Sequence, residues 1–184
     1  MKNLKSQVWY TDFVLGISIF IILLIIYFTY TLNLSKQDTK VLNDLITNSK
    51  SISSSLILEG YPDNWNKDNV QRIGLTNNNQ RIEENKLGQF LNLSYNTRKT
   101  LFNTQYDYFI FFKNNYGCLI NISDNFGIGH EDVELEEIAN PACNGFSEDS
   151  IDLSDINPKS IVRTDRLLIY NSEIVDMVIY LWQK

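Results

Sequence analysis

Two patterns of apolar residues follow one another in the first third of the chain. From Phe13 to Leu32 no charged residue occurs, and Ile, Leu, Phe and Tyr dominate. Twenty helical residues are about 30 Å long, which matches the hydrocarbon thickness of a bilayer. We therefore predict a membrane-spanning helix at residues 7–33, with membrane lipid as its surroundings.

Beyond Leu32 the apolar residues become periodic. They recur at steps of three and four residues through Leu45, Ile52 and Leu56, which is the pattern of one buried helix face. No proline occurs before Pro62, and Gly60 supplies a stop. These features predict one nearly continuous helix from about Val8 to Leu58. Its second half is amphipathic and needs a partner surface.

After Pro62 the pattern changes to short mixed elements that form a head at residues 34–184 together with the amphipathic half of the helix. A four-stranded antiparallel sheet packed on that helix accounts for them, so the predicted fold class is α+β. The expected elements are a strand at Val70–Leu75, a helix at Glu83–Leu91, a helix at Tyr95–Phe102 with Ser94 as N-cap, a strand at Tyr106–Phe112, a turn at 114–117 into a hairpin strand at Cys118–Ile122, and a closing hairpin of Ile161–Tyr170 and Glu173–Trp182.

Charge predicts the orientation of the chain. Lys2 and Lys5 precede the span without an acid before Asp12, so the positive-inside rule places the N-terminus in the cytoplasm and residues 33–184 outside. A cleaved secretory signal peptide is the alternative, but the apolar run is too long and no small-x-small cleavage site follows it. The net charge of -6, from 16 Lys+Arg and 22 Asp+Glu, gives nucleic-acid binding no electrostatic support.

Leader, span and head together resemble an archaeal type IV pilin or pseudopilin, a family with a class III signal peptide and lollipop-shaped subunits. The resemblance rests on Lys5-Ser6-Gln7, on Asp12, on Gly60-Tyr61-Pro62-Asp63-Asn64-Trp65, on Arg72-Ile73-Gly74-Leu75 and on Arg166-Leu167-Leu168-Ile169-Tyr170-Asn171. It implies that a prepilin peptidase cuts between Ser6 and Gln7 and removes residues 1–6 as a leader. It also implies that other pilin-like subunits are the partners of this chain.

The resemblance gives Asp12 a role. In pilins an acid at the fifth mature position pairs with the N-terminal amine of a neighbouring subunit, and Asp12 is the sixth residue counted from Gln7. A carboxylate inside an apolar helix costs about 3 kcal/mol unless it finds a partner. Alternatively, Asp12 reaches the headgroup region and stays hydrated. We expect the pairing role.

Two cysteines and three sequons lie on the side predicted to be exported. Cys118 and Cys143 are the only cysteines, and oxidising surroundings favour a disulfide between them over two unpaired thiols. Asn-x-Ser sequons begin at Asn33, Asn92 and Asn121, so N-glycosylation is permitted at each.

Candidate chemistry is sparse in the rest of the sequence. Ten acids and no Lys or Arg lie between Lys113 and Lys159, so a calcium site is an alternative to a solvated acidic surface; its ligands would be Asp124, Glu131, Asp132 and Glu134. His130 is the only histidine and has no nucleophile motif beside it, so we expect a loop residue. No nucleotide-binding or zinc-protease motif is present. We expect neither a cofactor nor an enzyme.

The leading hypothesis is a minor pilin or pseudopilin of an archaeal type IV filament-type assembly. The first rival is a permanently anchored protein whose extracytoplasmic head binds a ligand or partner. An anchored enzyme is a third hypothesis. Processing separates the first two, because a pilin begins at Gln7 after cleavage and a permanent anchor keeps Met1.

Overall fold

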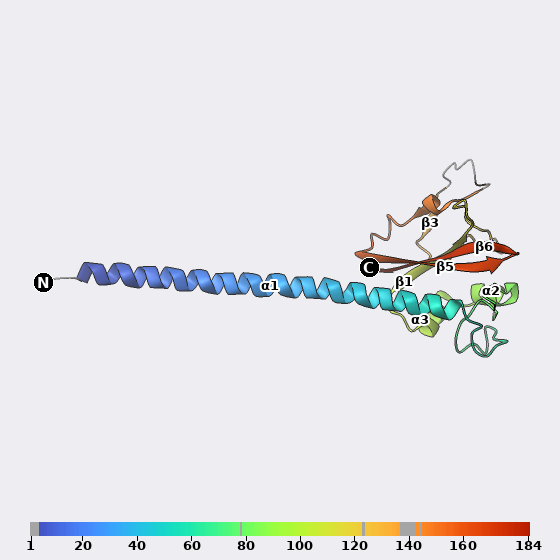
Figure 1. Ribbon diagram of the computed structural model, residues 1–184, viewed down its shortest axis with the longest axis horizontal. Coiled ribbons are helices and arrows are strands. Elements are labelled where there is room, and N and C mark those ends of the chain that lie inside the picture. The colour runs from blue at the N-terminus through green and yellow to red at the C-terminus, as the bar shows by residue number, and fades with distance from the viewer. Residues whose placement is uncertain (1–3, 78, 123, 137–142, 144) are drawn as a thin grey trace. The chain divides into compact units, whose positions relative to one another are not determined.

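A computed structural model describes residues 4–77, 79–122, 124–136, 143 and 145–184, and does not describe the side chains of 4–9 and 33–38. The chain divides into two compact units, Met1–Val41 and Leu42–Lys184. The first unit holds only the N-terminal part of helix α1 (Leu4–Leu56), and the second holds the rest of α1 and every other element (Figure 1).

The predicted continuous helix is confirmed. α1 has 53 residues without a break, because no proline interrupts it and its one glycine, Gly16, is tolerated. It ends two residues before the predicted Leu58. The segment that follows takes up the free carbonyl groups of its last turn: the backbone N–H of Leu75 donates to Leu56 O (2.8 Å), and Thr76 Oγ1 donates to Ile57 O (2.5 Å).

This cap replaces the strand predicted at Val70–Leu75, so that prediction is wrong. The segment forms only isolated bridges, Tyr61 with Arg72 and Thr76 with Ile82. Its apolar side chains are buried as in a strand, with Ile73 and Leu75 at 1% and 0% exposure. Its backbone groups bond to Tyr61 and to the end of the helix instead of to a neighbouring strand, and the apolar pattern cannot distinguish these arrangements.

The predicted four-stranded antiparallel sheet is present, in the order β2-β1-β6-β5. Its strands are β1 (Asp107–Lys113), β2 (Gly127–Gly129), β5 (Ser160–Tyr170) and β6 (Glu173–Gln183), and every neighbouring pair is antiparallel. The closing hairpin turns at Asn171 and Ser172, both at positive φ, as a tight two-residue turn requires.

The strand predicted at Cys118–Ile122 is wrong. The turn at 114–117 forms, and the chain pairs with the end of β1 only briefly: Leu119 bridges Lys113, and the N–H of Ile120 donates to Phe112 O (2.8 Å). Leu119 donates its N–H to Phe146 O (2.9 Å), and Cys118 bridges Ser147, so the later chain competes successfully for this segment. The place beside β1 goes to β2 instead.

The remaining elements are short. α2 (Glu84–Leu91) and α3 (Tyr95–Phe102) confirm the two predicted helices, and Ser94 caps α3 by accepting the N–H of Thr97. The acidic region holds a small ribbon of β3 (Glu134–Leu135) and β4 (Ile151–Asp152), with the 3₁₀ turn η1 (Glu148–Ser150) before β4.

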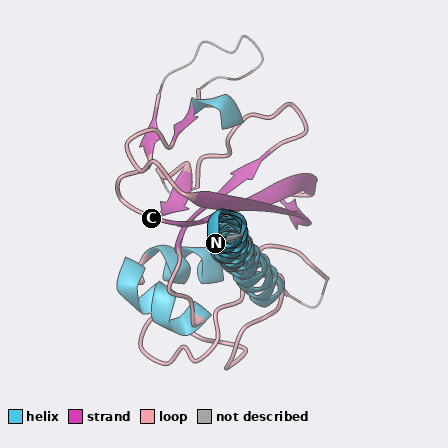
Figure 2. Cartoon of the chain, turned by 90° about the vertical axis from the view of Figure 1, so that its left-hand side faces the viewer, coloured by secondary structure: helices cyan, strands magenta, loops and turns pink. Residues whose placement is uncertain are grey.

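Within the second unit both faces of the sheet are covered (Figure 2). Ser49 of α1 contacts Thr164 of β5 between hydroxyl oxygens 2.7 Å apart, which places α1 on the face where Tyr108, Ile179 and Leu181 point. A loop-rich layer that carries β3, β4 and η1 covers the other face. Its core contains Phe109, Phe111, Leu119, Ile156, Val178 and Trp182. The fold is α+β, with one face of the sheet packed against helix as predicted.

Candidate functional site

The N-terminal part of α1 has an apolar surface that the chain itself does not cover. Residues Tyr10–Leu32 have a mean hydropathy of 2.6, and none of this window is buried. By length and composition this helix can cross a membrane. Such a surface is not stable in water, so it needs either lipid or the apolar helices of other proteins.

Three small hydroxyl side chains in this segment form hydrogen bonds within the helix. The hydroxyls of Ser18, Thr29 and Thr31 donate to the carbonyl oxygens four residues earlier, at 2.8, 2.8 and 2.9 Å. These hydroxyls therefore need no water, which suits a hydrocarbon environment.

Asp12 is the one acidic residue in this segment. Its side chain is exposed, and residues 10–32 contain no Lys or Arg that could pair with it. Its charge therefore depends on what surrounds the helix. The predicted cleavage point precedes it: Ser6 and Gln7 lie near the start of α1, but their side chains are outside the described ones.

The amphipathic half of α1 is tightly joined to the head. Leu45, Ile52 and Leu56 are at most 1% exposed. At the end of the helix Ser55 Oγ donates to Ile73 O (2.6 Å). The helix that presents Asp12 is thus also the central element of the head's core.

Gly60, Trp65 and Gly74 pack closely together beside this helix end. Trp65 Nε1 donates to Gly74 O (2.9 Å), and the indole is only 3% exposed. A Cβ on Gly74 would overlap backbone atoms of Leu58 and Gly60, so no larger residue fits. Two of the three head segments on which the family resemblance rests, one around Trp65 and one around Gly74, therefore meet and fasten the helix end.

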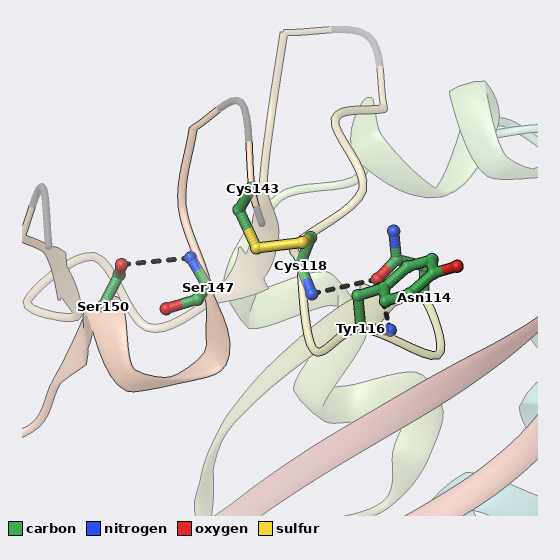
Figure 3. Close-up of a disulfide and its surroundings, with 6 residues drawn as sticks. All are labelled: Asn114, Tyr116, Cys118, Cys143, Ser147 and Ser150. Carbon is green, nitrogen blue, oxygen red and sulfur yellow. Dashed lines mark hydrogen bonds between the residues drawn. A yellow bond between two sulfur atoms is a disulfide. The ribbon is translucent and has the colours of Figure 1, made fainter. Parts of the chain in front are cut away.

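Cys118 and Cys143 form the predicted disulfide (Figure 3). On one side of the bond, Asn114 Oδ1 accepts the N–H groups of Tyr116 and Cys118, both at 3.0 Å, and shapes the turn after β1. The bond therefore links this turn to the loop-rich layer that carries β3, β4 and η1.

Removing the disulfide should weaken the head. The double substitution Cys118→Ser/Cys143→Ser opens a loop with a sequence separation of 25 residues. We expect the free energy of unfolding to fall by about 3 kcal/mol, because the open chain gains conformational entropy when unfolded. Urea unfolding of the full chain in detergent, followed by tryptophan fluorescence, measures this. Dithiothreitol should lower the wild-type midpoint similarly and leave the double variant unchanged; a wild-type midpoint insensitive to reduction contradicts the prediction.

Glu148 of η1 joins the loop-rich layer that carries β3, β4 and η1 to the sheet. Its carboxylate pairs with Lys113 of β1 (2.6 Å), forms an ion pair with Arg163 of β5 and accepts the hydroxyl proton of Tyr180 of β6 (3.0 Å). Burial and this hydrogen bond raise the pKa of Tyr180 to about 12. Sequence pattern alone does not single out Glu148, since its three partners lie 15, 32 and 35 residues away along the chain.

A second polar cluster surrounds Asp107 at the start of β1. Burial raises the pKa of this carboxyl, but hydrogen bonds from Lys99 Nζ and Tyr95 Oη (both 2.8 Å) outweigh burial and hold the pKa below its ordinary value. His130 lies in a loop, as predicted, with Nε2 4.0 Å from the same carboxylate.

The other predicted site residues are dispersed. Asn92 and Asn121 are exposed, as glycosylation requires, and the side chain of Asn33 is outside the described ones. Asp124, Glu131, Asp132 and Glu134 are exposed, and within the described ranges no three His, Cys, Asp or Glu residues come together as metal ligands.

Sequence reasoning missed a buried cation, Arg98 of α3. It is 8% exposed and lines a cavity of about 660 Å³ at the edge of the sheet. A signal was present: Tyr95, Arg98 and Phe102 are spaced three and four residues apart, which puts the arginine on the apolar stripe of its helix.

Comparisons with known proteins add no relative: no protein-family model, no curated protein and no solved structure matches this chain.

Proposed function

We propose that this chain is a minor pilin or pseudopilin-like subunit of an archaeal type IV filament-type assembly. The observation that carries the proposal is the uncovered surface of Tyr10–Leu32, on a helix that continues without a break into the core of the head. Such a helix serves two states: lipid covers it before assembly, and helices of neighbouring subunits cover it afterwards.

Asp12 supports assembly over simple anchoring. A tether needs only apolar residues, and an ionisable residue in a span usually marks a function. In an assembly the new N-terminal amine of a neighbouring subunit would neutralise it. The disulfide fits a head on the exported side, where oxidation is possible.

Processing tests this proposal directly. Protein extracted from the membranes of the cells that naturally make it should begin at Gln7, as read by intact mass and N-terminal sequencing. The same chain made in cells without a prepilin peptidase should keep Met1 and serves as the control. Met1 retained in cells with an active peptidase overturns the proposal.

The second candidate function is a permanently anchored protein with a ligand-binding head. The cavity beside Arg98 favours it, because a buried cation facing a cavity can recognise an anion. Retained Met1 together with ligand binding would establish this alternative.

A further inference from the structure

A cavity of about 660 Å³ lies along the free edge of β2, within the second unit. Its size is within the range of small-molecule sites. The wall comes from the end of α2, from α3 and from the loops on either side of β2; its lining includes Leu91, Asn92, Arg98, Asn125, Phe126 and Glu131. No part of the proposed assembly surface belongs to it.

Two glycines shape the edge of the sheet at this cavity. A Cβ on Gly127 would overlap the ring of Phe109, and one on Gly129 would overlap backbone atoms of β1. Since His130 directs its N–H to Tyr108 O in β1, the alternating pattern of an antiparallel pair turns the backbone groups of Gly129 toward the open edge. The cavity therefore meets bare backbone along β2.

Arg98 is the unusual side chain of this wall. Among the described residues two cationic side chains are buried, Lys86 at 7% exposure and Arg98 at 8%. Lys86 pairs with Glu83 (3.3 Å) and donates to Thr76 O (3.2 Å). Arg98 has no described carboxylate within 4.0 Å, and its buried Nε has no hydrogen-bond acceptor.

The surroundings of Arg98 compensate only part of its burial. Its guanidinium carbon lies 5.3 Å from the ring centroid of Phe90, a cation–π contact. The hydroxyl of Tyr108 is close enough to interact with the charge of Arg98; it is buried and also has no hydrogen-bond partner among the described residues. A buried cation normally acquires an anionic partner, and the described residues do not provide one here.

We propose that this cavity binds a small organic monocarboxylate, whose carboxylate pairs with the guanidinium of Arg98. The planar guanidinium matches a carboxylate with two parallel hydrogen bonds. Amide groups of Asn92 and Asn125 offer polar contacts, and Phe126 offers an apolar wall for the rest of the ligand.

The rim of the cavity selects the charge of the ligand. Asp124 and Glu131 are exposed and line it. Their carboxylates repel a dianion more strongly than a monoanion, so inorganic phosphate should bind more weakly than a monocarboxylate. The site does not depend on whether the chain assembles into a filament.

Glycine labelling makes the cavity directly observable. The chain has eight glycines, and three of them, Gly88, Gly127 and Gly129, line the cavity. In the full chain labelled with ¹⁵N-glycine and held in detergent micelles, the other five amide signals are internal references. Carbonyl-¹³C phenylalanine identifies Gly127, because Phe126-Gly127 is the one Phe–Gly pair in the sequence.

Titration with sodium glucuronate should shift the Gly127 and Gly129 signals saturably and leave the references in place. Glucose, the matched neutral sugar, should shift neither signal, and phosphate should bind more weakly than glucuronate. Unmoved Gly127 and Gly129 signals in saturating glucuronate overturn the proposal. Equal responses to glucose, or phosphate binding as tight as glucuronate binding, overturn it as well.

Two variants test the role of Arg98. Arg98→Gln should weaken glucuronate binding at least about tenfold, because it removes the charge-assisted pair. Asn92→Asp changes an exposed residue and places a carboxylate at the cavity, so it should weaken binding several-fold with the fold intact. If Arg98→Gln moves the reference signals, Asn92→Asp decides alone. Wild-type affinity in the deciding variant overturns the proposal.

Discussion

Asp12→Ala should abolish incorporation into the proposed assembly while leaving membrane insertion intact. Alanine is more apolar than aspartate, so the span of Tyr10–Leu32 becomes easier to insert. In the assembly, the amine of the neighbouring subunit would lose its carboxylate, and breaking a buried ion pair costs about 3 kcal/mol or more. Incorporation should therefore fall by roughly 100-fold or more. Immunoblots of sheared filaments against membrane fractions measure both quantities.

Ser18→Ala is the matched control for Asp12. Ser18 is an exposed residue of the same span, and its hydroxyl serves only the carbonyl of Val14 among the contacts seen. This variant should insert and assemble as the wild type does. Asp12→Glu keeps the charge and should restore part of the incorporation. Normal incorporation of Asp12→Ala would show that the carboxylate only stays hydrated at the headgroups.

Gly74→Ala should strongly destabilise the head. The added Cβ would overlap backbone atoms of Leu58, Glu59 and Gly60, which cannot move aside as a side chain can. The same shift would disturb the hydrogen bond from Trp65 to Gly74 O. We expect a loss of about 3 kcal/mol, at the upper end of overpacking effects, and a melting temperature roughly 10 °C lower. Circular dichroism during heating of the full chain in detergent measures this.

Gly88→Ala adds the same methyl group where there is room. Apart from the adjacent residues and the backbone of its own helix, no atom lies within 4 Å of the new Cβ, and Gly88 is inside α2, where alanine favours the helix. The free energy of unfolding should stay the same or rise by up to about 1 kcal/mol, so the melting temperature should not fall. Equal melting temperatures for Gly74→Ala and Gly88→Ala would show that the close packing of Gly60, Trp65 and Gly74 does not fasten the helix end.

Local patterns determined much of the fold. The uncharged run and the three- and four-residue spacing that follows it predict α1. A helix that is apolar on all sides suits a membrane, and apolar residues three and four positions apart lie on one face of a helix, which packs against the head. Ser94 predicts the start of α3, and the pair Asn171-Ser172 predicts the closing turn, since caps and turns use side chains that are neighbours in sequence. For the same reason, the two predicted strands of that hairpin are found at their expected places.

Tertiary competition decided the rest. Val70–Leu75 and Cys118–Ile122 are apolar and extended in pattern, yet neither forms a strand. The N–H of Leu75 bonds to Leu56 at the end of α1, and the N–H of Leu119 bonds to Phe146. Which partner a buried backbone group takes depends on segments distant in sequence, so periodicity carries no information about it. Glu148 and Arg98 show the same for charge: Glu148 gained three polar partners, whereas Arg98 gained no carboxylate among the described residues.

The sequence by itself determined that this chain has an apolar helix able to span a membrane, an acid near its start and a head of helix and antiparallel sheet. These are local properties of composition and period. Only the tertiary structure decided how the helix is fastened, through Trp65 and Gly74, and that a buried arginine faces a cavity beside β2. Both depend on contacts between residues far apart in the chain, and folding alone brings those residues together.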